Sequence, residues 1–266
     1  MSTPIMRRSR VLQQLRSGAI VHSIKLNFAD ARIAEMAALL GIDCIWTDME
    51  HVANDWSIIE NQIRAAKVHD TDTIVRVARG SYSDYIRPLE LDAAGIMVPH
   101  VKSAAEAEEI VRAVKFYPIG LRPVDGGNAD GSYCLIPITD YIHQANAERF
   151  VILQIEDPEP LAEIDRIAQL PGVDMLFFGP GDFSQAIGAP GQLEHPQVCE
   201  ARIRVAEAAV RAGIFAGTVG TPDNSAELAK LGYRFINIGS DVNGLGSYFR
   251  RLAGRQPESV HQRGGY

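Results

Sequence analysis

The sequence lacks any long hydrophobic run: no stretch approaches the ~20 apolar residues that a transmembrane helix needs. The arginines near the N-terminus are followed by neither an apolar segment nor a small-residue cleavage site, so no secretory signal is predicted. Cysteine is scarce, and Cys44, Cys134 and Cys199 share no spacing typical of disulfides or metal sites. These absences predict a cytoplasmic protein with reduced thiols and no membrane partner.

Positive charge is also in short supply. The chain has 26 Lys and Arg against 33 Asp and Glu, a formal net charge of −7. This balance argues against nucleic acid as a partner, although a small anionic substrate responds to local potential rather than to net charge. The hydrophobic content of 46% supports a large core, and 266 residues suit a single (β/α)8 barrel.

Apolar runs rich in β-branched residues alternate with helical patterns along nearly the whole chain. The predicted strands are 19–24, 43–48, 73–77, 95–99, 150–156, 173–178, 214–218 and 235–239. The predicted helices are 8–16, 30–40, 56–69, 83–92, 103–116, 160–170, 196–212, 223–231 and 241–252. Alternation predicts a parallel sheet, and eight repeats favour a closed barrel over an open doubly wound sheet. No G-x-G-x-x-G follows the first strand to favour a dinucleotide fold.

We therefore expect one domain, an α/β (β/α)8 TIM barrel over residues 1–254, followed by a polar tail at 255–266. Residues 117–144 have no clear period and hold several glycines and prolines. Long segments of this kind in a compact domain are usually functional or disordered, so we expect an active-site loop there.

Two carboxylates follow neighbouring predicted strands. Glu156 ends the strand 150–156, and Asp182 lies in the turn 179–184 that follows the next strand. Consecutive parallel strands of a βαβ unit deliver both residues to the same end of the sheet. Two carboxylates suit Mg²⁺, which leaves its other positions to water and substrate, and the N–H groups of Gly181 and Asp182 could receive a substrate carboxylate. Taken singly, Glu156 could be a solvated strand end and Asp182 a helix N-cap.

Other predicted strand ends carry a base candidate and a cation. Histidine is the side chain most often used as a general base, so His51 can serve in that role, with Asp48 or Asp92 as a carboxylate that could set its tautomer. Arg76 offers a forked donor for a carboxylate or a developing enolate oxygen. His51 could instead cap the helix that begins near Asp55, and Arg76 could be an interior ion-pair partner.

These groups together fit enolate formation from a pyruvate-like acid. A metal ion that polarises the keto and carboxylate oxygens of a 2-oxo acid would acidify the adjacent methyl group, which leads to aldol cleavage or addition. A Schiff-base aldolase would need a lysine in the barrel mouth, and Lys25 is the only strand-end candidate. Because the metal ligands make an imine redundant, we predict that Lys25 is not the nucleophile.

The sequence resembles the metal-dependent 2-oxo acid aldolases typified by 4-hydroxy-2-oxoheptanedioate aldolase. This is the HpcH/HpaI aldolase/citrate lyase family, within the phosphoenolpyruvate/pyruvate barrel superfamily, and the resemblance extends from about residue 19 to residue 245. The matching motifs are DMEHVAN at 48–54, VR at 75–76, LDAAG at 91–95, VP at 98–99, YPIGLR at 117–122, QIE at 154–156 and FGPGDFS at 178–184.

The resemblance implies a class II aldolase that cleaves a 4-hydroxy-2-oxo acid to pyruvate and an aldehyde, and catalyses the reverse addition. The pyruvate enolate would be held at a divalent metal ion, Mg²⁺ or Mn²⁺ with Co²⁺ as a further option. The implied metal ligands are Glu156 and Asp182. The implied substrate contacts are Arg76, Gln154, Gly181 and Asp182, and the implied catalytic residues are His51, Arg76, Asp48 and Asp92. The family's usual assembly implies a homohexamer of dimers that exchange the helix 241–252.

Three segments depart from the family pattern: 23–27, which includes Lys25, the stretch between Arg76 and Asp92, which is slightly longer than usual, and 123–133. The first and the last are expected to face the aldehyde half of the substrate, so the pyruvate half is predicted and the aldehyde is left open. An alternative is an oxaloacetate decarboxylase or a macrophomate-synthase-like enzyme that uses the same enolate. A catalytically inactive barrel is a third hypothesis, and His100 is left without a role.

Overall fold

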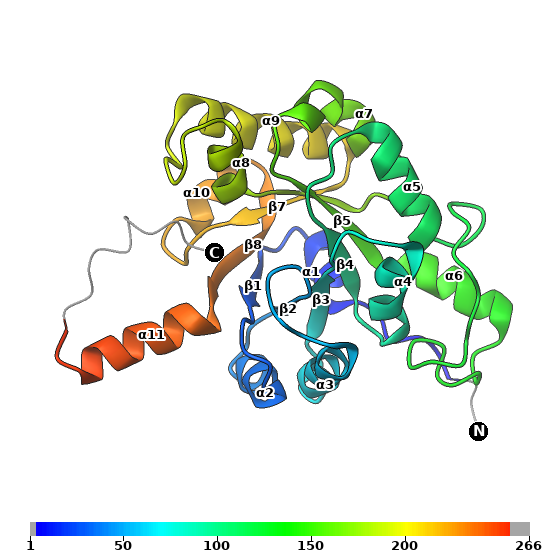
Figure 1. The fold of residues 1–266 in the computed structure, drawn as a ribbon. Coiled ribbons are helices and arrows are strands. Elements are labelled where there is room, and N and C mark those ends of the chain that lie inside the picture. Colours follow the sequence, from blue (N-terminus) through cyan, green and yellow to red (C-terminus); the bar gives the residue numbers. More distant parts are fainter. Residues whose placement is uncertain (1–3, 256–266) are drawn as a thin grey trace.

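The computed structural model describes residues 4–255 and shows a closed barrel of parallel strands surrounded by helices (Figure 1). The strands are β1 Val21–Lys25, β2 Cys44–Asp48, β3 Asp72–Arg76, β4 Gly95–Val98, β5 Phe150–Ile155, β6 Met175–Phe178, β7 Phe215–Val219 and β8 Tyr233–Ser240. They pair in chain order, and β8 closes the barrel onto β1. The predicted (β/α)8 barrel is confirmed.

The helices lie close to their predicted positions, except that one predicted helix is split, one helix lies in the expected loop, and one occupies the predicted turn 179–184. They are α1 Arg10–Arg16, α2 Ala31–Leu39, α3 Trp56–Lys67, α4 Tyr82–Glu90, α5 Ala104–Val114, α6 Ile138–Glu148, α7 Ile164–Ala168, α8 Pro180–Ala186, α9 Pro196–Ala212, α10 Ser225–Lys230 and α11 Asp241–Leu252. The predicted helix 160–170 is split into a 3₁₀ turn, η1 Glu159–Glu163, and α7, and α6 occupies part of the expected loop. No described helix is long and apolar enough to cross a membrane.

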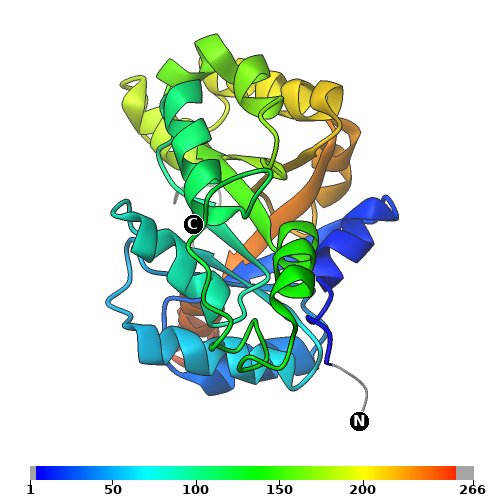
Figure 2. The ribbon, with the colours of Figure 1, turned by 90° about the vertical axis from the view of Figure 1, so that its right-hand side faces the viewer.

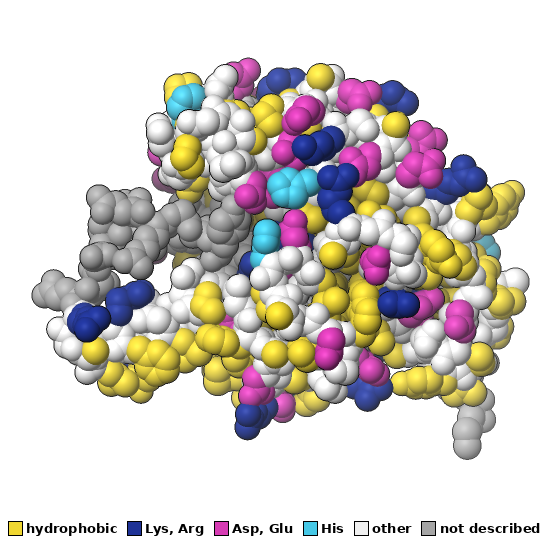
Figure 3. Space-filling model, viewed as in Figure 1, with side chains coloured by type: hydrophobic (Ala, Val, Ile, Leu, Met, Phe, Trp, Pro, Cys, Tyr) yellow, Lys and Arg dark blue, Asp and Glu magenta, His cyan; other side chains and the backbone are white. Residues whose placement is uncertain are grey.

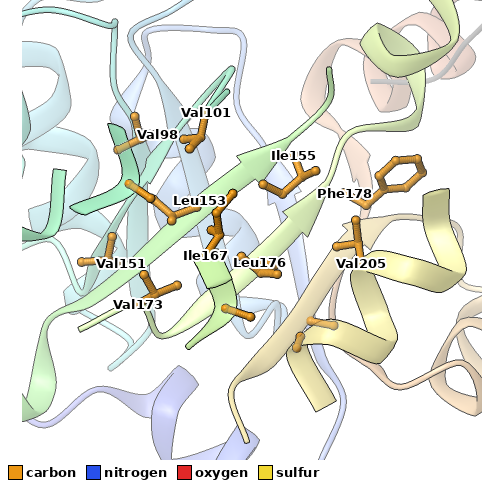
Figure 4. Packing of buried hydrophobic residues seen from close by; sticks show 14 of the residues in the cluster. Val98, Val101, Val151, Leu153, Ile155, Ile167, Val173, Leu176, Phe178 and Val205 are labelled. Atoms are coloured by element: carbon orange, nitrogen blue, oxygen red, sulfur yellow. The ribbon is translucent and has the colours of Figure 1, made fainter. Parts of the chain in front are cut away.

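The two faces of each strand pack into different cores, because successive side chains of a strand point to opposite sides. In β5, Phe150 and Ile152 point into the barrel, where α1 covers the amino end of the strands. The outward residues of β5 and β6 pack with α7 and α9, as Figure 4 shows for Leu153, Ile155 and Leu176. The inward series of β5 continues past Ile152 at every second residue. This period therefore turns Gln154 and then Glu156 towards the barrel axis.

Residues 117–144 lie at the amino end of the barrel, so the expectation of an active-site loop is wrong for this chain. Helix α5 runs back from the carboxyl ends of the strands, and the segment that follows it lies beside α4, where Asp130 N–H donates to Glu90 O at 3.4 Å. Arg122 and Tyr141 both donate to Asp130, at 3.1 and 2.8 Å. Figure 2 shows this green segment and α6 beside the chain that leads into α1. The stretch 123–133 therefore does not face the substrate of its own chain.

Helix α11 extends away from the barrel (Figure 1), and none of its residues is buried within the described chain. Its exposed large hydrophobic residues are Val242, Leu245, Tyr248, Phe249 and Leu252. The predicted polar tail lies outside the described residues except for Arg255.

Candidate active site

Charged and amide side chains fill the carboxyl end of the barrel interior. They come from the carboxyl ends of four strands, and all of them are buried: Lys25 on β1, Asp48 on β2, Arg76 on β3, Gln154 on β5 and Glu156 just after β5. In Figure 3, histidine, acidic and basic side chains gather near the middle of the face shown. Active sites of TIM barrels lie at the carboxyl ends of the strands, so this cluster is the candidate active site.

Asp48 and Arg76 form a bidentate ion pair across β2 and β3. Arg76 Nε donates to Asp48 Oδ1 at 3.0 Å and Nη2 donates to Oδ2 at 2.6 Å. Lys25 Nζ lies 2.9 Å from the same Oδ2, and Glu50 N–H donates to Oδ1 at 3.0 Å. Burial disfavours the charged carboxylate, but Arg76 and Lys25 outweigh it and hold the pKa of Asp48 at about 2. Both oxygens of Asp48 are therefore engaged.

Arg76 keeps one donor free for a ligand. Its side chain is fully buried, and its guanidinium carbon lies 5.1 Å from the centroid of the Trp46 ring. Nη1 is buried and finds no hydrogen-bond partner among residues 4–255. Leaving a buried donor unsatisfied costs roughly 1–3 kcal/mol, which an anionic substrate oxygen would recover. Arg76 is thus an interior ion-pair partner that also retains a donor for substrate.

Glu156 is a buried carboxylate whose charge is poorly compensated. It is 1% exposed, and it accepts hydrogen bonds from Gln154 Nε2 and, at 3.0 Å, from His100 N–H. Burial and the charge of Asp182 outweigh the influence of His100 and Arg76, and raise the pKa of Glu156 to about 8. A Cβ atom at position 179 would lie 2.5 Å from Glu156 Oε2, so any residue larger than glycine there would clash with the carboxylate.

The oxygen-rich corner around Glu156 and Asp182 fits a hard divalent cation. Asp182 lies in the first turn of α8, directly after β6, and its charge contributes to the raised pKa of Glu156. A bound cation would relieve this repulsion, and Gln154 Oε1 is a buried acceptor without a partner in the described chain. Carboxylate and carbonyl oxygens suit Mg²⁺ and Mn²⁺. Among residues 4–255, no group of three or more His, Cys, Asp or Glu residues could hold a metal ion, so these two carboxylates would need water or substrate oxygens as further ligands.

His51 lies at the rim of the barrel with its side chain 55% exposed, and its Nε2 is 3.5 Å from Glu50 Oε2. The helix-cap alternative is wrong, because Asp55 caps α3 by accepting a hydrogen bond from Ile58 N–H at 2.9 Å. Asp48, one of the two carboxylates expected to orient His51, is instead bound by Arg76 and Lys25.

Asp92 lies at the opposite end of the barrel from His51. It follows α4 and precedes β4, and its carboxylate pairs with Lys67 and Arg149 at the amino ends of the strands. Within one chain, Asp92 and His51 therefore do not meet, and a role for Asp92 beside His51 stays a prediction. The LDAAG motif identifies Asp92 as a family residue. Because Asp92 precedes β4 rather than following it, the side chain lies at the amino end of the barrel, away from the candidate active site.

Glu50 and His100 belong to the site, although the sequence analysis assigned neither of them a role. Glu50 Oε2 lies 3.1 Å from Arg76 Nε, and Glu50 Oε1 lies 3.8 Å from His100 Nε2. His100 Nδ1 is 2.9 Å from Asp157 Oδ2. Burial lowers the pKa of His100, but Asp157, Glu156 and Glu50 outweigh it and raise the pKa above its usual value. The signal in the sequence was that both residues closely follow predicted strands.

Comparison with known proteins agrees with this geometry. The family model described as HpcH/HpaI aldolase/citrate lyase matches residues 26–246. A hydroxypyruvate/pyruvate aldolase from Pseudomonas aeruginosa is 35% identical over 249 residues, which cover 93% of this chain and 92% of that protein.

Two solved structures share the whole barrel. An HpcH/HpaI aldolase/citrate lyase family protein from Burkholderia cenocepacia J2315 superposes with a TM-score of 0.85 at 31% identity, covering 92% of this chain and 98% of the other. Macrophomate synthase superposes with a TM-score of 0.81 at 27% identity, covering 95% and 90% of the two chains.

Proposed function

We propose a function from the premise that this chain belongs to the HpcH/HpaI aldolase/citrate lyase family and is a carbon–carbon lyase. The proposed reaction is the divalent-metal-dependent cleavage of a 4-hydroxy-2-oxo acid to pyruvate and an aldehyde, together with the reverse addition. The observation that carries the proposal is a buried cation with a free donor, Arg76, in the same barrel mouth as the repelling carboxylates Glu156 and Asp182.

Glu156 and Asp182 would hold Mg²⁺ or Mn²⁺, with Co²⁺ as a further option. When bound there, the ion would polarise the keto and carboxylate oxygens of a 2-oxo acid and so acidify the adjacent methyl group. Arg76 Nη1 and the amide of Gln154 would orient the pyruvate unit. The N–H groups of Gly181 and Asp182, which lack intrahelical acceptors in the first turn of α8, would receive its carboxylate.

His51 would act as the base that takes the proton from the 4-hydroxyl group. The bond between C3 and C4 then breaks, its electron pair moves into the enolate of pyruvate, and the aldehyde leaves. Arg76 would stabilise the enolate oxygen, because its guanidinium group stays charged throughout the reaction. Asp48 would act through Arg76, since the bidentate pair sets the direction of the guanidinium group.

A second candidate uses the same enolate without the hydroxyl base. Oxaloacetate decarboxylation, or carbon–carbon bond formation of the macrophomate-synthase kind, would need the metal and Arg76 but no proton transfer from a 4-hydroxyl group. The structural likeness to macrophomate synthase is the observation that favours this candidate.

We also propose that the chain forms a homo-oligomer, a hexamer of dimers that exchange α11. The exposed apolar residues of α11, together with its position away from the barrel, support this proposal, because a helix of this length with no buried side chain gains little stability alone. Light scattering coupled to size-exclusion chromatography would measure the mass, and a monomer at micromolar concentration would contradict the proposal.

The function is tested by incubating the protein with pyruvate, Mg²⁺ or Mn²⁺ and a panel of aldehydes, and identifying the adducts by mass spectrometry. Exchange of the pyruvate methyl protons with D₂O, followed by NMR, reports enolate formation independently of the aldehyde. Glu156→Gln removes charge at nearly constant volume and is the matched control. If no divalent metal supports methyl-proton exchange, the barrel is catalytically inactive.

A further inference from the structure

We propose that Lys25 is a specificity-determining residue, which binds a singly charged acid group on the aldehyde half of the substrate. The inference rests on the site of the proposed function, and it names the class of aldehyde that this site takes. Lys25 is a buried cation at the mouth of the barrel, and it shares its counter-charge with Arg76.

Lys25 and Arg76 are the two buried cations at the carboxyl ends of the strands. The other buried lysine and arginine side chains among residues 4–255 lie towards the amino ends, and they are Lys115, Arg122 and Arg149. Because the free donor of Arg76 serves the pyruvate half, Lys25 is the cation that remains for the other half of the substrate.

Lys25 and the metal-binding corner lie on opposite sides of the barrel mouth. In the closed order of eight strands, β1 lies four strands from β5 in either direction, and Glu156 directly follows β5. Arg76, on β3, lies between the two. A 2-oxo acid held at Glu156, Asp182 and Arg76 would extend the rest of its chain across the mouth towards β1. This direction brings the substituent of the aldehyde half to Lys25.

The ammonium group of Lys25 has donors left for a ligand. Within residues 4–255, its one recorded ion-pair partner is Asp48 Oδ2, which lies 2.9 Å from Nζ and also accepts from Arg76 Nη2 at 2.6 Å. A lysine ammonium has three N–H donors, and a buried cation is costly unless it is well paired. An acid group of the substrate would complete the pairing, and a single ammonium matches the charge of a carboxylate better than that of a phosphate.

The neighbouring end of β8 supplies room but no competing carboxylate. Lys25 pairs in register with Ser240, and a Cβ atom built at the preceding Gly239 would meet no heavy atom within 4 Å in the described chain. Asp241, which follows β8, accepts from two backbone N–H groups at 2.9 Å each. Its carboxylate is therefore occupied, and an acid group from the substrate meets open space beside Lys25.

The first test is calorimetric and needs no turnover. 2-Oxoglutarate, 2-oxoadipate and 2-oxopimelate are titrated into the protein with Mg²⁺, each beside the 2-oxo monoacid of the same chain length. A hydrogen bond to a charged group is typically worth about 10–100-fold in affinity. We expect the wild type to prefer at least one diacid by about this factor. Lys25→Met removes the charge at similar length and should abolish the preference, whereas Lys25→Arg should retain it.

Lys115→Met is the matched control for the binding test. Lys115 is also a buried lysine that lies 2.9 Å from an aspartate oxygen, Asp174 Oδ2, but at the amino end of the barrel. Its variant should keep the wild-type preference, and circular dichroism checks that each variant is folded. Equal affinities of the wild type for every diacid and its monoacid, or a preference that survives in Lys25→Met, would overturn the inference.

The second test compares the addition of pyruvate to succinic semialdehyde and to 4-methylpentanal, a neutral aldehyde of similar shape. Lys25→Met should lower kcat/KM for the anionic aldehyde about 10–100-fold more than for the neutral one, mainly through KM. Losses of equal size for both aldehydes and for exchange of the pyruvate methyl protons would show that Lys25 only supports Asp48 and Arg76. This result would overturn the assignment of Lys25 to the aldehyde half.

The two tests separate this inference from the aldolase function. Wild-type protein that forms no adduct with any aldehyde, but binds a diacid more tightly than its monoacid through Lys25, would overturn the function and support the assignment of Lys25. Wild-type protein that forms adducts equally well with both aldehydes, and binds each diacid no more tightly than its monoacid, would support the function and overturn the assignment.

Discussion

Asp48 and Arg76 face each other in register on β2 and β3, and two hydrogen bonds of 3.0 and 2.6 Å join them. Both carboxylate oxygens of Asp48 are bound by Arg76, so Asp48 is not available to orient His51. This separates the proposed roles of the two groups, because Arg76 would serve any reaction that forms an enolate, whereas His51 would serve only the step that removes a hydroxyl proton.

His51→Ala and Arg76→Ala should therefore give different kinetic patterns. A general base typically contributes about 10²–10⁴-fold, so His51→Ala should depress aldol cleavage by about that factor and affect oxaloacetate decarboxylation much less. Arg76→Ala should depress both reactions. Steady-state assays at saturating metal concentration measure the two rates. Equal losses in both reactions for His51→Ala would remove the assignment of His51 as the hydroxyl base and favour the decarboxylase function.

Asp48→Asn should destabilise the fold as well as the site. Removing one partner of a buried ion pair typically costs about 3–5 kcal/mol, because Arg76 and Lys25 would lose their shared counter-charge. In the wild type, the pKa of Asp48 is lowered from its usual value of 3.8 to about 2. Its contribution to stability, about 2 kcal/mol, is present above pH 3.8 and is lost as the pH falls through 2. Urea unfolding at several acidic pH values measures this, and an equally steep acid dependence in Asp48→Asn would contradict it.

Glu156 should give the metal-free protein the opposite pH dependence. Its pKa is raised from 4.5 to about 8, so the folded state retains a proton that the unfolded state has lost between these values. Stability of the metal-free protein should decrease as the pH rises from 4.5 to 8. Added Mg²⁺ or Mn²⁺ should raise the melting temperature more at pH 8 than at pH 5, because binding requires the carboxylate.

Two variants test whether Glu156 and Asp182 bind the metal ion. Glu156→Gln and Asp182→Asn should each remove the metal-induced rise in melting temperature and the metal-dependent activity while the circular dichroism spectrum stays unchanged. Full wild-type activity after chelator dialysis, without added metal, would show that the metal site is not catalytic.

Gly179→Ala should impair metal binding more than it impairs folding. The added Cβ would lie 2.5 Å from Glu156 Oε2 and 3.2 Å from Gln154 Nε2, so it would displace the ligand carboxylate. Gly126→Ala, in the segment that follows α5, is the matched control, because its Cβ would meet no heavy atom within 4 Å in the described chain. Calorimetric titration with Mn²⁺ measures the affinity, and unchanged binding in Gly179→Ala would place the metal elsewhere.

Lys25 should not form an imine with pyruvate. Its Nζ lies 2.9 Å from Asp48 Oδ2 in a buried ion pair, and this contact occupies the nitrogen that would have to attack the keto group. Borohydride treatment in the presence of pyruvate, followed by peptide mass spectrometry, should leave Lys25 unlabelled. Labelling of Lys25 together with activity that survives a chelator would establish Schiff-base chemistry.

The sequence alone determined the barrel and much of its mouth. Alternating strand and helix patterns are local properties, and eight repeats of them leave few arrangements other than a closed parallel barrel. The two-residue period of β5 turns Gln154 and Glu156 to the same side, and the following βα turn brings Asp182 to the same end. These residues could be predicted because strand direction and side-chain alternation follow directly from the order of residues.

Only the tertiary structure decided which groups touch. Asp48 pairs with Arg76 rather than with His51, and Glu50 lies between Arg76 and His51. These contacts depend on the directions of side chains from neighbouring strands, which the sequence does not give. Asp92 and residues 117–144 lie at the amino end because α4 and α5 carry the chain back there before β4 and β5 begin. A motif identifies residues, whereas the path of the chain between motifs sets the end of the barrel at which they lie.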